Sequence, residues 1–321
     1  MRRKCVIAAL GVALMCAPGT WLRTPVPDNS PASVLVERIA GASPTRDGAW
    51  QVAGVWRYSA DSRNFGGYSA LLAFDEDRFA AFSDRGHRFV FPLPRAEDRT
   101  PVSGGPTAEQ DVPSALEDEL WDIESATRDP ATGHYWLGFE NFHAILRYTP
   151  GHAPDAMRVL EGEVGWPSNA GAEAMIRLAD GRFVVLPEGG DEGLVFASDP
   201  VLGASAEPFD FRRPVPGYAA TDLAQLPDGR VLLLMRDTVF AIPPFETLIA
   251  IGPPPRAGEA WTPRLALRLD PVIPSENYEG LAVRPLEDGR VAVWLMADDN
   301  LSVLQRTLLA KLVFDPSAER D

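Results

Sequence analysis

The residues most able to do chemistry in this sequence are acids that recur at the starts of apolar runs. Glu124, Glu173, Asp222 and Glu279 each introduce such a run, and Ser69 takes the same place in the first of them. Each run leads to a turn or loop, in most units rich in Asp and Gly, and a second apolar run follows, which is typical of a β-hairpin. A single acid at a strand start is usually solvated, so the repetition is the informative feature.

A second series of acids follows the second apolar run, at Asp84, Glu140, Glu188 and Asp298, whereas the fourth unit has Arg236 there. Residues equidistant from a hairpin turn lie side by side, so both series reach the same end of the hairpins. Like charges that face each other across strands are unfavourable. Clustered carboxylates must therefore raise their pKa values, find basic partners or bind a cation.

Carboxylate oxygens favour Ca²⁺ over zinc, because hard cations prefer hard oxygen ligands. The chain has four histidines and two cysteines, and both cysteines, Cys5 and Cys16, lie near the N-terminus. A multi-histidine site and a zinc–thiolate site are thereby disfavoured. Solvation, or hydrogen bonding to loop backbone, is the alternative for any single acid. We predict a calcium site whose ligands are Asp84, Glu124, Glu173, Glu188, Glu279 and Asp298.

The hairpin units recur at intervals of about 50 residues, which is the repeat length of a β-propeller blade. Weaker strand-like runs that complete two of these units lie at 194–197, 208–212, 239–242 and 265–269. We predict an all-β propeller with five or six four-stranded blades. Because the first strand of each blade lines the central channel, the first acid series is expected around one mouth of it.

Two further strand-like runs, at 34–39 and 50–58, precede the first hairpin. We expect them to complete the last blade, whose third strand is predicted at 307–314, because a ring closed by N-terminal strands leaves no long exposed edge. A sixth blade is the alternative. The single propeller domain is predicted at 34–317, with a polar, Pro/Gly-rich loop insertion at about 95–119 in the first blade.

Residues 1–24 have the layout of a secretory signal peptide: a basic start, an apolar run at 5–17, and then Pro18 and Gly19. An uncleaved membrane anchor and a buried N-terminal helix are the alternatives. Cleavage leaves a mature chain without cysteine, which suits an oxidising compartment. We therefore expect a periplasmic or secreted protein.

The formal net charge is -15, and 30 prolines and 27 glycines are spread along the chain as expected for many short strands and tight turns. A surface of this sign repels nucleic acid and anionic lipid, so neither is an expected partner of the mature domain. It also repels an anionic substrate unless a cation intervenes. The oligomeric state is left open by the sequence.

Several short segments of the sequence are typical of one known family. They include "NFGGYSALLAF" from Asn64, "DIESAT" from Asp122, "AEAMIRLADGRFVVLPE" from Ala172 and "NYEGLAVRPLEDGRVAVWLMADDN" from Asn277. In these words the chain resembles the phytase-like family with esterase-like activity, which are exported bacterial β-propellers. The resemblance implies a propeller fold, export and ester hydrolysis. Two departures are Ala70, where the family usually has Gly, and Arg236, where an acid is common.

The leading interpretation is a metal-dependent hydrolase of phosphoric esters, acting on a small-molecule, phosphorylated ester. Bound Ca²⁺ would neutralise and polarise the phosphate while water attacks. Arg85 is the candidate phosphate clamp, and His87 the candidate for proton transfer. An Arg85–Asp84 ion pair and a surface role for His87 are the alternatives. A Ca²⁺-dependent carboxylic-ester or lactone hydrolase, and a non-catalytic binding propeller with structural Ca²⁺, remain open; no Gly-x-Ser-x-Gly elbow supports a serine hydrolase.

Overall fold

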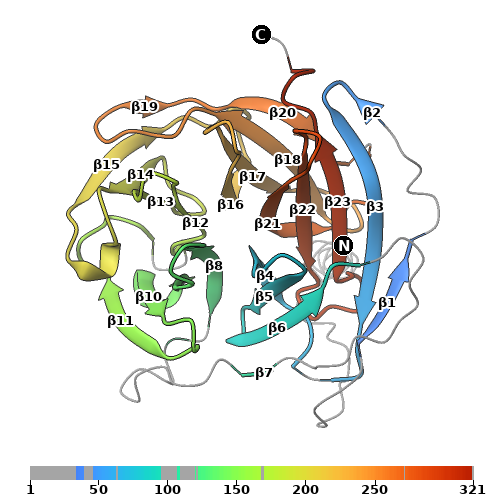
Figure 1. Cartoon of the computed structure of the whole chain (residues 1–321), viewed down its shortest axis with the longest axis horizontal. Helices are drawn as coiled ribbons and strands as arrows, with labels where there is room; N and C mark the ends of the chain where they lie inside the picture. The colour runs from blue at the N-terminus through green and yellow to red at the C-terminus, as the bar shows by residue number, and fades with distance from the viewer. Residues whose placement is uncertain are drawn as a thin grey trace, which may run out of the picture.

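The strands of this protein are arranged as blades around a central axis (Figure 1). The computed structural model describes residues 34–39, 46–62, 64–94, 107–108, 120, 122–167, 170–270 and 272–319. These residues form five sheets, each of which is one blade. The predicted all-β propeller is confirmed, and the blade count that the sequence left open is five.

Blades 1 to 4 follow one another along the chain, each built outward from an innermost strand. Blade 1 contains β4 (Tyr68–Ala73), β5 (Arg78–Ser83), β6 (His87–Pro92) and β7 (Thr107–Ala108). Blade 2 contains β8 (Ile123–Arg128), β9 (Tyr135–Phe139), β10 (Ala144–Tyr148) and β11 (Pro154–Val159), with the short helix η2 (Asn141–His143) between β9 and β10.

Blade 3 contains β12 (Ala174–Arg177), β13 (Phe183–Leu186), β14 (Glu192–Phe196), β15 (Ala206–Phe211) and the added parallel strand β19 (Ala260–Trp261). The short helix η3 (Pro200–Leu202) connects β14 to β15. Blade 4 contains β16 (Ala219–Gln225), β17 (Val231–Thr238), β18 (Phe245–Gly252) and β20 (Arg264–Arg268).

Blade 5 joins the two ends of the described chain. Its strands are β21 (Asn277–Pro285), β22 (Val291–Asp298), β23 (Leu308–Phe314), then β3 (Trp50–Ser59), with β1 (Leu35–Arg38) and β2 (Arg46–Asp47) pairing on β3. The register of β23 against β3 runs from Leu308 opposite Arg57 to Phe314 opposite Trp50. Closure of the ring by N-terminal strands is therefore confirmed, and it covers the edge that β23 would otherwise expose.

Hydrophobic side chains fill the spaces between neighbouring blades. On β22, Val293 and Leu295 pack toward blade 4, whereas Trp294 and Met296 pack toward blade 1. This alternation follows from the period of two in a strand, which sends successive side chains to opposite faces. Middle strands such as β13 and β22, all of whose residues are buried, are covered on both faces, so they are mostly apolar and the acids of the candidate site lie near strand ends. Among the described residues, no helix is long and apolar enough to cross a membrane.

One predicted strand is wrong. The run at 239–242 lies in the loop between β17 and β18, and the actual third strand of blade 4 begins at Phe245. Pro243 and Pro244 lack the backbone N–H that a strand ladder needs, so pairing starts only after them. The predicted signal peptide at 1–24 lies outside the described residues, as does the insertion at about 95–119 apart from β7.

Candidate metal centre

A β-bulge marks the channel-mouth end of four innermost strands. The pairing register skips one residue there, at Ser69 in β4, Glu124 in β8, Thr221 in β16 and Glu279 in β21. A bulged residue is not paired in the ladder and its side chain is turned away from the regular pleat. Glu173 lies directly before β12, in the corresponding place of blade 3. Glu124 and Glu279 therefore share a local backbone geometry.

Asp222 does not belong to this series, which corrects its expected place at the mouth. The bulge in β16 falls on Thr221, so Asp222 stands one residue further along the strand. Its carboxylate accepts hydrogen bonds from the backbone N–H of Leu281 at 2.6 Å and of Leu223 at 2.7 Å. It is 1% exposed, and burial raises its pKa well above the ordinary value. Asp222 thus joins blade 4 to blade 5.

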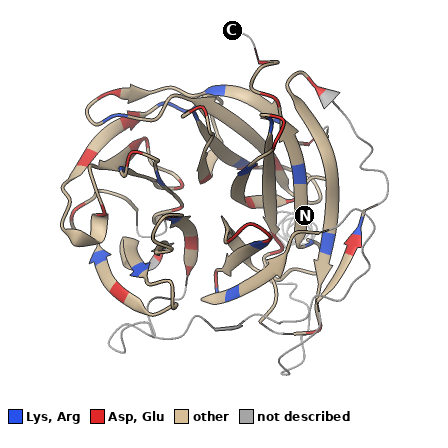
Figure 2. Cartoon of the chain, in the orientation of Figure 1, with Lys and Arg blue, Asp and Glu red and all other residues tan. Residues whose placement is uncertain are grey.

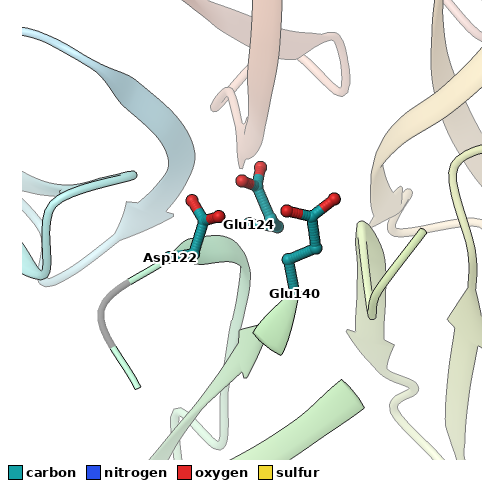
Figure 3. A group of neighbouring side chains, drawn as sticks. All are labelled: Asp122, Glu124 and Glu140. Atoms are coloured by element: carbon teal, nitrogen blue, oxygen red, sulfur yellow. The ribbon is translucent and has the colours of Figure 1, made fainter. Parts of the chain in front are cut away.

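Three carboxylates converge at the channel end of blade 2, and we call them the carboxylate trio: Asp122, Glu124 and Glu140. One oxygen of each lies within 4.8 Å of the others. Asp122 precedes β8, Glu124 is the bulged residue and Glu140 follows β9, and Figure 3 shows the three side chains extending toward the same space. Their spacing suits oxygen ligands of one cation.

Burial and mutual repulsion disfavour the charged form of the trio. Burial, then the charges of Glu173, Glu279 and Asp122, raise the pKa of Glu124 well above its ordinary value. Burial and a hydrogen bond with Asp122 raise the pKa of Glu140 to about 7. Burial also raises the pKa of Asp122, although hydrogen bonds with Glu140 and Glu124 oppose it. Within the described chain no Lys or Arg forms an ion pair with the trio, so protons or a cation must compensate its charge.

The other predicted ligands lie around the same mouth. Burial and then the charges of Glu188, Glu140 and Glu279 raise the pKa of Glu173, which is 8% exposed. Burial, then Glu279 and Asp84, raise the pKa of Asp298. Asp84 also acts on Asp122 across the boundary between blades 1 and 2. Each of the six predicted ligands therefore interacts electrostatically with at least one other of them.

Arg236 compensates the acids on the opposite side of the mouth. Its guanidinium lies 2.8 Å from Glu188 and 3.1 Å from Glu279, and it donates to Asn277 Oδ1 at 2.8 Å. We call Arg236, Glu188, Glu279 and Asn277 the arginine cluster. Burial lowers the pKa of Arg236, but the carboxylates Glu279, Glu188 and Glu173 outweigh it and keep the guanidinium charged. The residue that departs from the acidic pattern is thus an internal counter-ion.

Sequence reasoning missed Asp122 and Asn277 as members of the site. Each stands two residues before a bulged glutamate, in "DIE" and "NYE", and a spacing of two sends side chains to the same face of a strand. Asn277 Nδ2 donates to Glu279 at 3.0 Å and to Asp298 at 3.4 Å. The repeated acid–x–Glu or amide–x–Glu pattern is the signal that could have identified both.

Arg85 and His87 lie beside Asp84, at the turn from β5 to β6. The backbone N–H of His87 donates to Ser83 Oγ at 3.1 Å, and that of Arg85 does so at 3.3 Å. Burial and the charge of Arg85 lower the pKa of the His87 imidazole, which favours its neutral form. Their roles in phosphate binding and proton transfer stay predictions.

The donors at this mouth fit Ca²⁺ better than a softer metal. The trio offers only carboxylate oxygens, from two adjacent strands of a rigid blade, and no thiol or imidazole is among its ligands. Elsewhere on the described ring, Asp and Glu are interspersed with Lys and Arg (Figure 2).

Several solved structures are similar to this chain at low sequence identity. The chain is similar to a luciferin-regenerating enzyme (12% identity, TM-score 0.45, 88% of this chain and 96% of that chain). It is similar to an endo-arabinase from Bacteroides thetaiotaomicron (12% identity, TM-score 0.49, 80% of this chain and 97% of that chain). A putative gluconolactonase matches at 11% identity and a TM-score of 0.45, over 91% of this chain and 97% of that chain. Similarity at this level says nothing about the activity of this chain.

No curated protein sequence matches the chain. The sequence model of one family does match, and it spans residues 63–301, from the start of blade 1 to the loop after β22. That span includes the trio, the arginine cluster, Asp84, Glu173 and Asp298. The family is described as phytase-like, with the esterase-like activity of phytase. On the extent of this match, the chain belongs to the phytase-like family.

Proposed function

We propose that this protein is a Ca²⁺-dependent hydrolase of phosphoric esters. The observation that carries the proposal is the carboxylate trio, three acids within 4.8 Å at the mouth of a propeller channel, with no Lys or Arg among the described residues in an ion pair with them. Membership of the phytase-like family supports the reaction class. An exported location, expected from residues 1–24, is part of the same proposal and suits an enzyme that uses extracellular Ca²⁺.

In this proposal Asp122, Glu124 and Glu140 hold the cation, and the charges of Glu173 and Asp84 act on the trio from the neighbouring blades. Bound Ca²⁺ supplies positive charge that neutralises a phosphate and polarises its P–O bonds. This matters because the acidic mouth would otherwise repel the substrate.

Two further side chains, Arg85 and His87, complete the proposed site. Arg85 binds a phosphate oxygen, because a guanidinium matches phosphate geometry through paired donors. His87, which burial and the charge of Arg85 favour in the neutral form, moves a proton between water and the leaving alcohol. The buried His87 Nδ1 has no hydrogen-bond partner among the described residues and is available for such a contact.

The proposal is tested by assaying the purified protein on generic phosphate monoesters, phosphate diesters, carboxylic esters and lactones, each with Ca²⁺ and with a chelator. Turnover of phosphate esters that disappears with the chelator and returns with Ca²⁺ supports it. Ca²⁺-dependent turnover confined to carboxylic esters or lactones would overturn the proposed substrate class but support the proposed role of the metal. Ca²⁺-dependent thermal stabilisation without turnover of any ester would instead make the protein a binding propeller.

The decisive variant is Glu124→Gln, which keeps the side-chain volume and removes one charge from the trio. Loss of turnover with a native circular dichroism spectrum links the trio to the reaction. The matched control is Glu161→Gln, an exposed glutamate of the same blade, which should keep full turnover.

A further inference from the structure

Two ring nitrogens beside the carboxylate trio have no hydrogen-bond partner among the described residues. His143 is 4% exposed, and its Nδ1 is buried. Trp166, in the connection between β11 and β12, buries its Nε1 in the same way. The two rings are edge to face, with centroids 5.8 Å apart and planes at 70°. Buried polar atoms are normally satisfied, so two adjacent exceptions call for a ligand.

The backbone holds these rings in place at a conformational cost. Phe142 has a φ of 63° and His143 a φ of 47°, in the left-handed region that residues other than glycine seldom adopt. Two backbone hydrogen bonds join this turn to the segment that leads to Trp166, from Leu160 to His143 O at 3.2 Å and from Glu161 to Phe142 O at 3.3 Å. The turn that carries His143 is therefore held against the start of the segment that leads to Trp166.

The pair is adjacent to the metal centre. His143 donates its backbone N–H to the carbonyl of Glu140 at 3.0 Å. Its ring is close enough to act on the Glu140 carboxyl electrostatically, and Glu140 in turn acts on Glu173 in blade 3. A group bound to the two nitrogens would thus lie between blades 2 and 3, on the side of the trio away from Arg85.

We infer that Trp166 Nε1 and His143 Nδ1 form a subsite for an oxyanion oxygen of the substrate, next to the cation held by the trio. An indole N–H can only donate, and an imidazole with its hydrogen on Nδ1 also donates, so the pair selects an acceptor and excludes a second cation. The two rings contact each other edge to face, with centroids 5.8 Å apart, so the two nitrogens belong to one packed pair. The inference rests on the proposed function, because it takes the oxyanion to be the phosphoryl group of the ester.

The experiment measures binding of inorganic phosphate and of Ca²⁺ separately, by calorimetry on the full chain. Trp166→Phe removes the donor and keeps an aromatic ring. His143→Phe removes the imidazole nitrogens, whereas His143→Asn places an amide nitrogen near Nδ1 and suits the positive φ. The matched control is Trp136→Phe, because that indole N–H donates to Asp199 at 2.9 Å on the outer part of blade 2.

We expect Trp166→Phe and His143→Phe each to weaken phosphate binding by about tenfold, as for the loss of a hydrogen bond to a charged group. His143→Asn and Trp136→Phe should bind phosphate as the parent does, and all four variants should keep the parent's Ca²⁺ affinity. KM for a phosphate ester should rise with the phosphate Kd, which separates the substrate's phosphoryl group from adventitious free phosphate.

Unchanged phosphate binding in both Trp166→Phe and His143→Phe would overturn the inference and leave the two nitrogens to structural water. Absence of phosphate binding by the parent chain, with Ca²⁺ present, would overturn it too. Failure of the metal proposal has a different signature: the calcium titration of the parent would show no binding even before phosphate is added.

Discussion

The two sides of the channel mouth hold acids of the same kind but compensate their charge differently. In the arginine cluster, the guanidinium of Arg236 lies within 3.1 Å of Glu279 and 2.8 Å of Glu188. In the carboxylate trio, one oxygen from each of the acids lies within 4.8 Å of the others, and no Lys or Arg of the described chain pairs with them. One side therefore carries its own cation, and the other leaves that place to a proton or an external cation.

The difference explains why a ring of similar residues has one candidate site. A covalently attached guanidinium cannot exchange, so it fixes Glu279 and Asn277 and makes that side structural. An uncompensated group of carboxylates is unstable by itself, and its cation can also contact a substrate. In an acidic channel, a candidate metal site is thus indicated by a group of carboxylates that has no Lys or Arg partner.

Removing the internal cation should produce the largest effect. We expect Arg236→Met to lower the free energy of unfolding by about 3–5 kcal/mol, because it leaves buried carboxylates without their partner. Urea unfolding of the variant and the parent in the presence of a chelator measures this difference in free energy. Arg212→Met is the control, since its ion pair with Asp210 is exposed and is worth at most about 1 kcal/mol.

The same variant also tests whether the two sides are interchangeable. With Arg236 replaced, the arginine cluster becomes a second set of uncompensated acids, so Ca²⁺ should restore more stability to the variant than it adds to the parent. An unfolding free energy equal to that of the parent, with or without Ca²⁺, would show that the guanidinium does not balance these acids.

Changing one acid of the trio should produce the next largest effect. Glu124→Gln should weaken Ca²⁺ binding by at least about 100-fold, the upper end of what is lost when a group supporting a metal ligand is removed. Asp222→Asn, at a buried acid one residue past the bulge in β16, should keep Ca²⁺ affinity. It should instead destabilise the fold by about 1–3 kcal/mol, because its buried carboxylate accepts two backbone N–H groups. Calorimetry measures the Ca²⁺ affinity of the two variants, and urea unfolding measures their stability. Equal losses of Ca²⁺ affinity in Glu124→Gln and Asp222→Asn would contradict the different roles assigned to these two acids.

Most of the fold could be predicted from the sequence because its signals are local and repeated. The runs at 281–283 and 291–295 alternate across two buried faces, and a tight Asp-Gly turn joins them. The strand predicted at 239–242 was wrong because its apolar residues do not show that Pro243 and Pro244 delay strand pairing until Phe245. Asp222 was misplaced by one residue, because the bulge that falls on Glu124 and Glu279 in their blades falls on Thr221 in blade 4, where no acid marks it.

The site was predictable only in outline, for a different reason. That acids gather at one mouth follows from hairpin symmetry. Which of them share a cation depends on contacts between blades, such as that of Arg236 with Glu188 from the preceding blade and with Glu279 from the following one. Such contacts link residues about 50 positions apart in the repeat and have no local pattern. Asp122 was detectable by its spacing of two from Glu124.

Without metal, the trio should make the fold less stable as pH rises. The pKa of Glu140 is about 7 in the folded chain against an ordinary 4.5, so the folded state holds the proton more tightly. The associated stabilisation is complete below the ordinary pKa and is lost as pH rises through about 7. In a chelator, Tm should therefore fall between about pH 5 and pH 8, and Ca²⁺ should reduce that fall because it binds the ionised form.

Glu140→Gln is the matched control for this titration, because it removes one of the titrating carboxyls and should flatten the Tm profile in a chelator. A Tm that rises over the same interval in the parent would mean that the trio is already compensated by a protein group.

The smallest expected effect concerns Glu188, which the sequence placed among the ligands. Its side chain is 34% exposed and pairs with Arg236, so Glu188→Gln should cost less than about 1 kcal/mol of stability. Because Glu188 pairs with Arg236 and is not one of the three clustered carboxylates, Ca²⁺ affinity should stay within about twofold of the parent. Side-by-side titration with Glu124→Gln gives the measurement. An equal loss of Ca²⁺ affinity in the two variants would make Glu188 a ligand, and the trio and the arginine cluster would then be parts of one larger centre in which Arg236 competes with the metal.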